Sequence, residues 1–202
     1  MSEPTRVLFW HRKGGTGKTS LAIGCARQLA RPGVSGQRPR VLLIDTDPQG
    51  SAAAWGERFA EGAGLVVRAD GGRDLWDRNR ALLNRFDRVL VDAAPSITAE
   101  TLDLLAGADR LLIPTRPAWP DVWALEAVAD LLADQQRVGH PLVARVVFNQ
   151  VRDEALSPYV AALAELGLES LPTPIPADPS WPELFRGGPP PAAVAALLRA
   201  LN

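Results

Sequence analysis

Lysine is scarce in this chain, whose 202 residues include only Lys13 and Lys18. The other basic residues are arginines, and 22 basic against 23 acidic residues leave a formal net charge of −1. The chain therefore has no overall basic field of the kind that attracts nucleic acid or an anionic membrane. Both lysines lie in one short glycine-rich stretch, residues 11–20, which is the first candidate for a functional site.

Cysteine is nearly absent, because Cys25 stands alone and cannot form an intrachain disulfide. Its place in a predicted helix favours a small buried apolar role over chemistry. No charged-then-apolar signal opens the chain, and no apolar run approaches the roughly 20 residues that a bilayer-spanning helix needs. We expect a cytoplasmic protein with no membrane segment, and a single domain over residues 1–202, of which 47% are hydrophobic.

Short apolar runs alternate with longer helical patterns along the chain. This rhythm predicts an α/β fold, a doubly wound and mostly parallel twisted sheet with helices on both faces. Predicted strands are 6–11, 40–45, 64–68, 88–92, 110–114, 143–149 and 171–175, and predicted helices are 18–30, 51–61, 73–84, 98–106, 121–137, 154–166 and 191–201. The prolines at 172–182 and 189–191 exclude regular helix there. Such sheets bind ligands at the carboxyl ends of their strands.

The glycine-rich stretch has the features of a nucleotide-phosphate cradle, as in P-loop NTPases. It follows an apolar strand and precedes a helix, so its backbone N–H groups can converge on an anion at the helix N-terminus. Lys18 is expected on the β and γ phosphates, and the Thr19 hydroxyl on Mg²⁺. Arg12 occupies the first glycine position of the common pattern, so the stretch matches the variant K-G-G-x-G-K-[ST], which includes Lys13.

Carboxylates end two further predicted strands. Asp92 is expected to hold Mg²⁺ opposite the phosphate loop, although a strand-ending aspartate also serves as a helix cap. Asp45 and Asp47 follow another strand, and we expect one to face the metal and the other to orient an attacking water. A capping turn is the alternative for this pair, because Asp-Pro and Gly-Ser are ordinary turn dipeptides.

A series of segments between about residues 5 and 180 matches a known family in order. They are 13–19 at the phosphate loop, 45–50 and 89–95 at two switches, 112–117 at a strand end, 147–150 with an asparagine, and 175–178 in a loop. Together they resemble the ParA/MinD-type partition and positioning ATPases, with their deviant Walker A loop. The first predicted strand begins within ten residues, so the likeness is to short ParA proteins without an N-terminal DNA-binding domain.

The resemblance implies an ATP-dependent dimerising switch that partitions or positions DNA or another large cargo. It implies ATP hydrolysis to ADP and phosphate, Mg²⁺ as cofactor, a homodimer that sandwiches ATP, and stimulation by an adaptor of ParB-like role. Lys13, Lys18 and Asp47 would be catalytic, with Lys13 reaching the partner's phosphates. Metal ligation would fall to Thr19, Asp45 and Asp92. The nucleotide would contact Gly14, Gly15, Thr16, Gly17, Lys18, Thr19, Ser20, Asn149, Pro176 and Asp178.

Several alternatives remain open at this level. A MinD-like positioning ATPase and a biosynthetic ATP-dependent ligase or amidase share the expected fold, although the latter would not need Lys13. Non-specific DNA binding at the nucleoid is possible for such a protein, yet the arginines of residues 68–88 are interleaved with aspartates, as on a solvated helix face. The segment Trp119–Trp123 is a candidate adaptor contact, or else one packed ridge. The apolar residues 192–201 favour core packing or dimer contact over lipid binding.

Overall fold

The computed structural model describes residues 3–32, 36–61, 64–137, 139 and 142–201. Within that part, the strands form one seven-stranded sheet of order β3-β2-β4-β1-β5-β6-β7, and every strand pairing is parallel. The strands are β1 (Thr5–Phe9), β2 (Val41–Asp45), β3 (Leu65–Ala69), β4 (Arg88–Asp92), β5 (Arg110–Thr115), β6 (Val143–Val151) and β7 (Ile175–Pro176). The predicted parallel α/β fold is confirmed.

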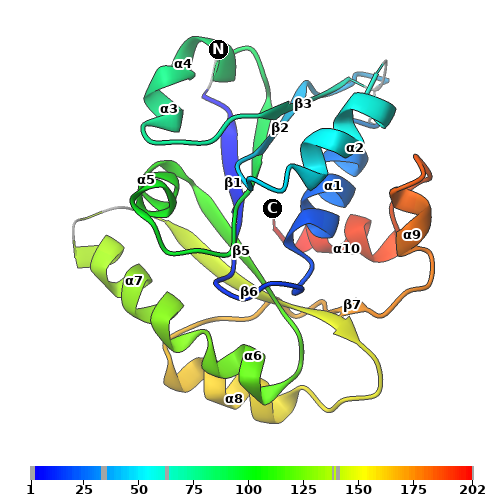
Figure 1. Ribbon diagram of the computed structural model, residues 1–202. Helices are drawn as coiled ribbons and strands as arrows, with labels where there is room; N and C mark the ends of the chain where they lie inside the picture. The colour runs from blue at the N-terminus through cyan, green and yellow to red at the C-terminus, as the bar shows by residue number, and fades with distance from the viewer. Residues whose placement is uncertain (1–2, 33–35, 62–63, 138, 140–141, 202) are drawn as a thin grey trace.

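Helices cover both faces of this sheet (Figure 1). One face carries α1 (Lys18–Leu29), α2 (Ser51–Phe59), α9 (Trp181–Leu184) and α10 (Ala192–Ala200). The other carries α3 (Leu75–Arg78), α4 (Arg80–Leu83), α5 (Ala99–Gly107), α6 (Trp119–Trp123), α7 (Glu126–Arg137) and α8 (Ser157–Glu165). Two apolar cores result, one on each face of the sheet. Alternating side chains of β1 and of Trp10, which follows it, contribute to both, since Leu8 and Trp10 lie in one core and Phe9 in the other.

Two predicted helices are each divided in the structure. The prediction of one helix over 73–84 is wrong, because Asn79 separates α3 from α4. The amide of Asn79 hydrogen-bonds Asp70 and the Leu75 carbonyl. The prediction of one helix over 121–137 is also wrong, since α6 begins earlier, at Trp119, and a break at Ala124 and Leu125 precedes α7. Pro120 in the first turn of α6 suits a helix start, where a missing N–H costs nothing.

The proline-rich segment departs from both sequence predictions. The predicted strand 171–175 is reduced to β7, Ile175–Pro176, because Pro172, Pro174 and Pro176 cannot donate to a ladder. Regular helix was predicted to be excluded over 172–182, but α9 begins inside that range at Trp181. Pro182 stands in its first turn, where proline is tolerated.

The C-terminal helix α10 packs on α1 rather than standing free. Val194 and Leu197 are fully buried, and a methyl of Val194 lies against Gly24. The core-packing interpretation of residues 192–201 is therefore confirmed. Cys25, also on α1, is buried as predicted. Among the described residues, no helix is both long and apolar enough to cross a membrane.

Candidate functional site

The glycine-rich loop joins β1 to α1 at the carboxyl edge of the sheet. Gly15 and Gly17 adopt φ values of 74° and 97°, a left-handed conformation that favours glycine. Gly17 caps α1 and its carbonyl accepts the N–H of Leu21 at 3.0 Å. A cavity of about 320 Å³ opens at this loop and is called the loop cavity here. Its lining residues are Gly14, Gly15, Gly17, Lys18, Thr19, Ser20, Asp47, Pro95 and Gln150.

Lys18 is the first residue of α1 and is only 7% exposed. Its ammonium donates to the carbonyl oxygen of Lys13 at 3.2 Å. Burial lowers the pKa of Lys18, and the nearby charges of Asp92 and Asp47 oppose that shift. A desolvated ammonium with so few partners is well suited to receive an anion from the loop cavity.

Asp92 ends β4 and is buried beside the ends of β1 and β2, where it pairs in register with Phe9 and Asp45. Both of its carboxylate oxygens are buried without a hydrogen-bond partner among the described residues. Burial raises the pKa of Asp92 to about 7, and the Thr19 hydroxyl lies close enough to oppose this rise.

The donor set around Asp92 fits Mg²⁺. An orphaned buried carboxylate with a neighbouring hydroxyl offers hard oxygen ligands, and Lys18 alone does not neutralise it. In the described part of the chain, no cluster of three or more His, Cys, Asp or Glu side chains forms an all-protein metal site. A cation here would therefore take its remaining ligands from phosphate and water, as Mg²⁺ commonly does.

Asp45 and Asp47 are placed differently from one another. Asp45 is buried, and its carboxylate accepts the N–H groups of Ala53 at 2.9 Å and Asp47 at 3.1 Å. It lines a cavity of about 560 Å³ beside α2 and not the loop cavity. These hydrogen bonds support the alternative that Asp45 caps a turn. A metal-binding role for Asp45 stays a prediction. Asp47 lines both cavities, and it accepts the N–H of Gln49 at 2.9 Å.

Lys13 does not line the loop cavity. Its ammonium contacts the carboxylate of Asp121, on α6, which is fully buried and also receives Arg116 Nε at 2.5 Å. Burial alone would raise the pKa of Asp121, but the hydrogen bonds from Arg116 and Lys13 lower it. Lys13, Arg116 and Asp121 border a separate cavity of about 350 Å³, which also includes Gln150, Arg152 and Glu154. The two lysines therefore face different spaces.

Asn149 lies behind the loop. It is 3% exposed, and its side-chain amide donates to the Thr16 carbonyl at 2.7 Å, while its own carbonyl oxygen is buried without a described partner. A Cβ at Gly17 would stand 2.1 Å from this amide, so a side chain at Gly17 is excluded. Thr16 is fully buried and does not line the loop cavity. Contact of Asn149 and Thr16 with a nucleotide stays a prediction.

Pro176 ends the edge strand β7, and Asp178 lies two residues after it. β7 pairs with β6, which sets Ile175 beside Asn149 and Pro176 beside Val151. Asp178 accepts the N–H of Ser180 at 2.7 Å and does not line the loop cavity. The structure thus brings this segment next to Asn149 in the sheet, but it gives Asp178 a local turn-capping partner.

His11 lies fully buried between β1 and the loop. Its Nδ1 accepts the backbone N–H of Lys13 at 2.8 Å, so the proton of the neutral ring resides on Nε2. Burial lowers the pKa of His11 to about 4, with a further contribution from the charge of Lys18. His11 therefore holds the start of the loop as a neutral imidazole.

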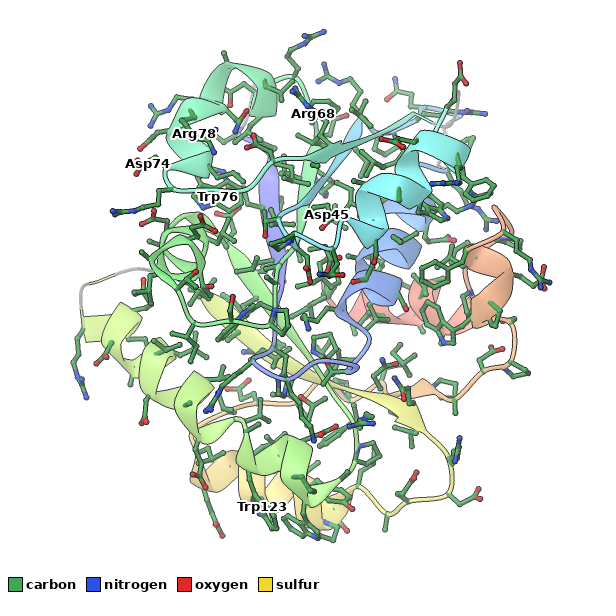
Figure 2. The ribbon with its side chains drawn as sticks, viewed as in Figure 1. Asp45, Arg68, Asp74, Trp76, Arg78 and Trp123 are labelled. Carbon is green, nitrogen blue, oxygen red and sulfur yellow. The ribbon has the colours of Figure 1, made fainter. Side chains whose placement is uncertain are left out.

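The two tryptophans of α6 do not form one packed ridge. Trp119 packs against Tyr159 with ring centroids 4.9 Å apart, whereas Trp123 is 61% exposed and points away from the molecule (Figure 2). The interpretation as a single packed ridge is wrong for Trp123, because most of its side chain is exposed, and Trp119 is packed only in part, with 42% exposed. An adaptor contact at this segment stays a prediction.

Arginines of the α3 region, among them Arg78 (Figure 2), form ion pairs with neighbouring carboxylates. The pairs are Arg73 with Asp103 at 3.2 Å, Arg78 with Asp70 at 3.2 Å and Arg80 with Asp77 at 3.1 Å. These pairs support a solvated surface over residues 68–88. Non-specific DNA binding stays a prediction.

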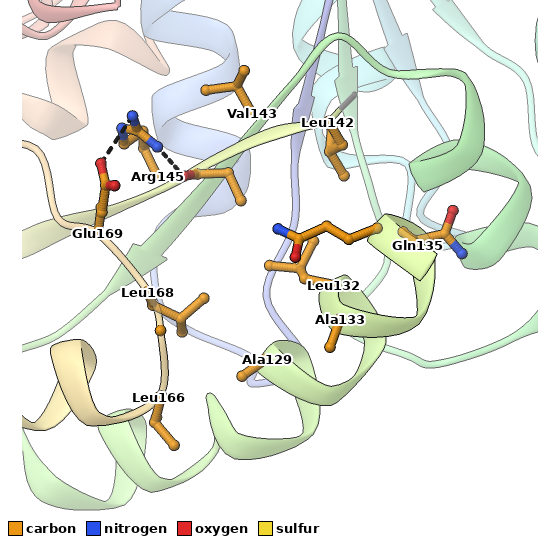
Figure 3. A pocket seen from close by; sticks show the side chains of 13 residues that line it. Ala129, Leu132, Ala133, Gln135, Leu142, Val143, Arg145, Leu166, Leu168 and Glu169 are labelled. Atoms are coloured by element: carbon orange, nitrogen blue, oxygen red, sulfur yellow. Dashed lines mark hydrogen bonds and ion pairs between the residues drawn. The ribbon is translucent and has the colours of Figure 1, made fainter. Parts of the chain in front are cut away.

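A further cavity of about 440 Å³ lies between α7 and β6 (Figure 3). It is bordered by apolar side chains such as Leu132 and Leu168, and an ion pair of 2.9 Å joins Arg145 to Glu169 at its rim. None of the predicted site residues lines it, so it is not part of the candidate site.

The sequence did not reveal the roles of Asp121, Arg116 and Gln150. Asp121 follows a proline at a helix start, which is typical of an ordinary first-turn acid. Gln150 directly follows Asn149, but nothing in its residue type signals the left-handed backbone that it adopts, with φ of 59°. Only the position of Gln150 next to a predicted site residue could have drawn attention to it.

Known proteins resemble this chain along most of its length. The model of the CobQ/CobB/MinD/ParA nucleotide binding domain matches residues 7–189. The maintenance of carboxysome distribution protein A of Gloeobacter kilaueensis is 31% identical over 172 residues, which cover 85% of this chain and 74% of that protein. The chromosome-partitioning ATPase Soj of Thermus thermophilus is 35% identical over 162 residues, covering 66% of this chain but only 62% of Soj.

Solved structures agree in fold. An ATP complex of Cyanothece McdA superposes with a TM-score of 0.81 at 18% identity, covering 100% of this chain and 97% of the other. A chain of the MinC:MinD cell division protein complex of Aquifex aeolicus gives a TM-score of 0.76 at 20% identity, covering 98% of this chain and 95% of the other. The family match over residues 7–189, together with the 31% identity to the Gloeobacter kilaueensis protein, shows that the chain belongs to the CobQ/CobB/MinD/ParA family of nucleotide-binding domains.

Proposed function

We propose that this protein is an ATP-dependent dimerising ATPase switch that positions or partitions a large cargo. The observation that carries the proposal is the loop cavity, which the loop glycines, Lys18, Thr19, Ser20 and Asp47 line together while Lys13 faces a different space. A metabolic phosphate site needs only the first set of groups. A lysine kept outside its own phosphate cavity suits a site completed by a second protomer.

The loop and Lys18 would bind the phosphates. Left-handed Gly15 and Gly17 shape a concave run of N–H groups at the start of α1, where the helix dipole also favours an anion. The Lys18 ammonium, now on the Lys13 carbonyl, would exchange that neutral partner for phosphate oxygens. The exchange strengthens the interaction because a charged acceptor replaces a neutral one.

Thr19 and Asp92 would hold Mg²⁺, and Asp45, which lies beside Asp92 on the neighbouring strand, would support them. When bound, Mg²⁺ neutralises negative charge on the β and γ phosphates. The unpartnered carboxylate of Asp92 supports this assignment, because a buried charge without a partner is costly unless a ligand compensates it.

Asp47 would orient the attacking water. It lies on the rim of the loop cavity, half-buried, and its carboxylate can accept a hydrogen bond from water placed in line with the γ phosphorus. Attack by that water breaks the bond between the γ phosphorus and the β–γ bridging oxygen, and ADP and phosphate result. Orientation is the main task, since phosphoryl transfer depends largely on positioning and charge stabilisation.

Lys13 would act across a homodimer, on the phosphates bound by the partner. A fixed cation supplied from another subunit stabilises charge on the transferring group and makes hydrolysis depend on association. The relatives support this kind of output, since their names record carboxysome distribution and chromosome partitioning, and MinD was solved with MinC. We infer a similar large cargo and a stimulating adaptor protein.

The alternative is an ATP-dependent ligase or amidase, because the family name includes CobQ and CobB. Such an enzyme would release phosphate only with an acceptor substrate, and its oligomeric state would not follow the nucleotide. The two functions are therefore separated by measuring mass and phosphate release in the same samples.

The test is light scattering after size exclusion, with Mg²⁺ and ATPγS, ADP or no nucleotide. We expect twice the protomer mass with ATPγS only, and loss of that dimer in Lys13→Ala. Arg12→Ala, which removes the neighbouring exposed cation, is the matched control and should dimerise normally. Asp47→Ala should dimerise but release phosphate about 100-fold more slowly. A wild-type mass that does not respond to ATPγS would refute the switch.

A further inference from the structure

We propose that Gln150 is a positioning residue of the phosphate loop, whose side-chain amide holds the Gly15 carbonyl so that the N–H groups of the loop face an anion. Gln150 lies at the end of β6, 135 residues away from its contact in the loop. Its effect on nucleotide binding rests on the proposed function, whereas its effect on the shape of the loop does not.

The backbone of Gln150 is strained. Its φ is 59°, and Asp74 is the other non-glycine residue with positive φ in the described part of the chain. Glycine would adopt this conformation freely, whereas a side chain disfavours it. Gln150 is exposed, so burial in a core does not account for a side chain at this position. The strain is explained if the side chain itself has a task.

A register shift between β6 and β7 lies at this residue. The pairing passes from Asn149 to Val151, so Gln150 is the extra residue of a bulge. In a regular strand, neighbouring side chains point to opposite faces and could not reach the same loop. The bulge instead lets both amides act on consecutive loop carbonyls. Asn149 donates to Thr16 at 2.7 Å, and Gln150 donates to Gly15 at 3.3 Å.

These contacts use carbonyl groups of the loop, which a phosphate does not need as partners. An anion nest requires N–H groups to point inward, and the carbonyls between them then point outward. The two amides donate to the carbonyls of Gly15 and Thr16 and make no use of the loop N–H groups. Gln150 also lines both the loop cavity and the cavity that contains Lys13, which places it at the boundary between the two.

Two variants separate the amide from the backbone. Gln150→Met keeps the size of the side chain and the strain but removes the donor, and Gln150→Gly removes the donor and relieves the strain. We expect both to loosen the loop equally, although Gln150→Gly raises the melting temperature relative to Gln150→Met. In nuclear magnetic resonance relaxation, the order parameters of the Gly15 and Gly17 amides should fall from about 0.85 to below about 0.6.

Asp74→Gly is the matched control, because it relieves the same left-handed strain on the opposite side of β1, near α3 (Figure 2). It should leave the loop amides unchanged. For ATPγS, both Gln150 variants should raise the dissociation constant about three- to tenfold, as expected for loss of one hydrogen bond that orders a site. Asp74→Gly should bind as the wild type does.

Three results would contradict the positioning role of Gln150, and a fourth would contradict only the proposed function. Unchanged loop amides in both variants, or loosening in Gln150→Gly alone, would overturn the positioning role. Loosened amides with an unchanged dissociation constant would also overturn it, because the shape of the loop would then not matter to the ligand. If the amides loosen but even the wild type binds no ATPγS, the role of Gln150 in shaping the loop stands and the proposed function fails.

Discussion

The ammonium of Lys13 contacts the carboxylate of Asp121, a residue 108 positions further along the chain. Asp121 is fully buried, while the Lys13 side chain is 32% exposed, so the acid is fixed and the lysine can leave. Arg116 donates two hydrogen bonds to the same carboxylate, from Nε at 2.5 Å and from Nη2 at 3.2 Å. Asp121 therefore stays paired if Lys13 departs, and departure does not leave a bare buried charge.

This relationship predicts that Asp121 restrains the dimer. Asp121→Asn should lower the ATPγS-dependent dimer dissociation constant about threefold, because a partly exposed ion pair is worth about 0.5–1 kcal/mol. Arg116→Ala should have the opposite effect, since the carboxylate then depends on Lys13 alone. Light scattering over a protein dilution series measures both. A weaker dimer in Asp121→Asn would instead mean that Asp121 assists Lys13 after association.

Gly17→Ala should disable the loop. The left-handed φ of 97° alone costs an alanine about 1–2 kcal/mol, and its Cβ would stand 2.1 Å from the Asn149 amide. We expect a loss of about 3 kcal/mol or more in the free energy of unfolding, measured by urea denaturation, together with loss of ATPγS binding. Gly167→Ala is the control, because Gly167 is also left-handed but has open space around its Cβ. It should lose only about 1–2 kcal/mol. Equal losses would show that the Asn149 contact adds nothing.

The buried His11 makes the free energy of unfolding depend on pH. Its folded pKa, about 4, lies below the ordinary value of 6.5, so between these values the unfolded chain binds more protons. The contribution of His11 to the free energy of unfolding is therefore fully present above pH 6.5. It falls by about 3 kcal/mol as the pH drops toward 4. His11→Asn keeps an acceptor for the Lys13 N–H and should lack this loss. Urea denaturation of both proteins at pH 4 and pH 7 measures the difference, and an equal loss in both would contradict the assignment.

Asp92→Asn should stabilise the folded protein but weaken its binding of Mg²⁺ with nucleotide. Removing a buried carboxylate whose pKa is raised to about 7 should increase the free energy of unfolding at pH 8 without metal by about 1–4 kcal/mol. Binding of Mg²⁺ with ATPγS should weaken at least about tenfold, because a hard oxygen ligand is lost. Asp77→Asn, at a side chain 78% exposed, should change stability by less than about 0.5 kcal/mol. A destabilised Asp92→Asn would mean that the carboxylate has a structural partner.

The sequence by itself determined the parallel sheet and the phosphate loop, because both depend on local patterns. Apolar runs at strand spacing, glycines at left-handed positions and a lysine at a helix start act within a few residues of one another. The same local logic placed Asp92 at a strand end beside the loop. Prediction failed where short-range patterns were ambiguous, as at Asn79, which divides one predicted helix into α3 and α4.

Only the tertiary structure decided which side chains hold the loop and where Lys13 rests. Gln150 reaches Gly15, Asn149 reaches Thr16 and Lys13 reaches Asp121 across more than 100 residues of chain. Those contacts arise because parallel strands bring distant segments to one edge of the sheet, and a bulge at Gln150 then turns a side chain that a regular strand would direct elsewhere. Sequence periodicity contains neither the strand order nor the bulge, so it could not reveal them.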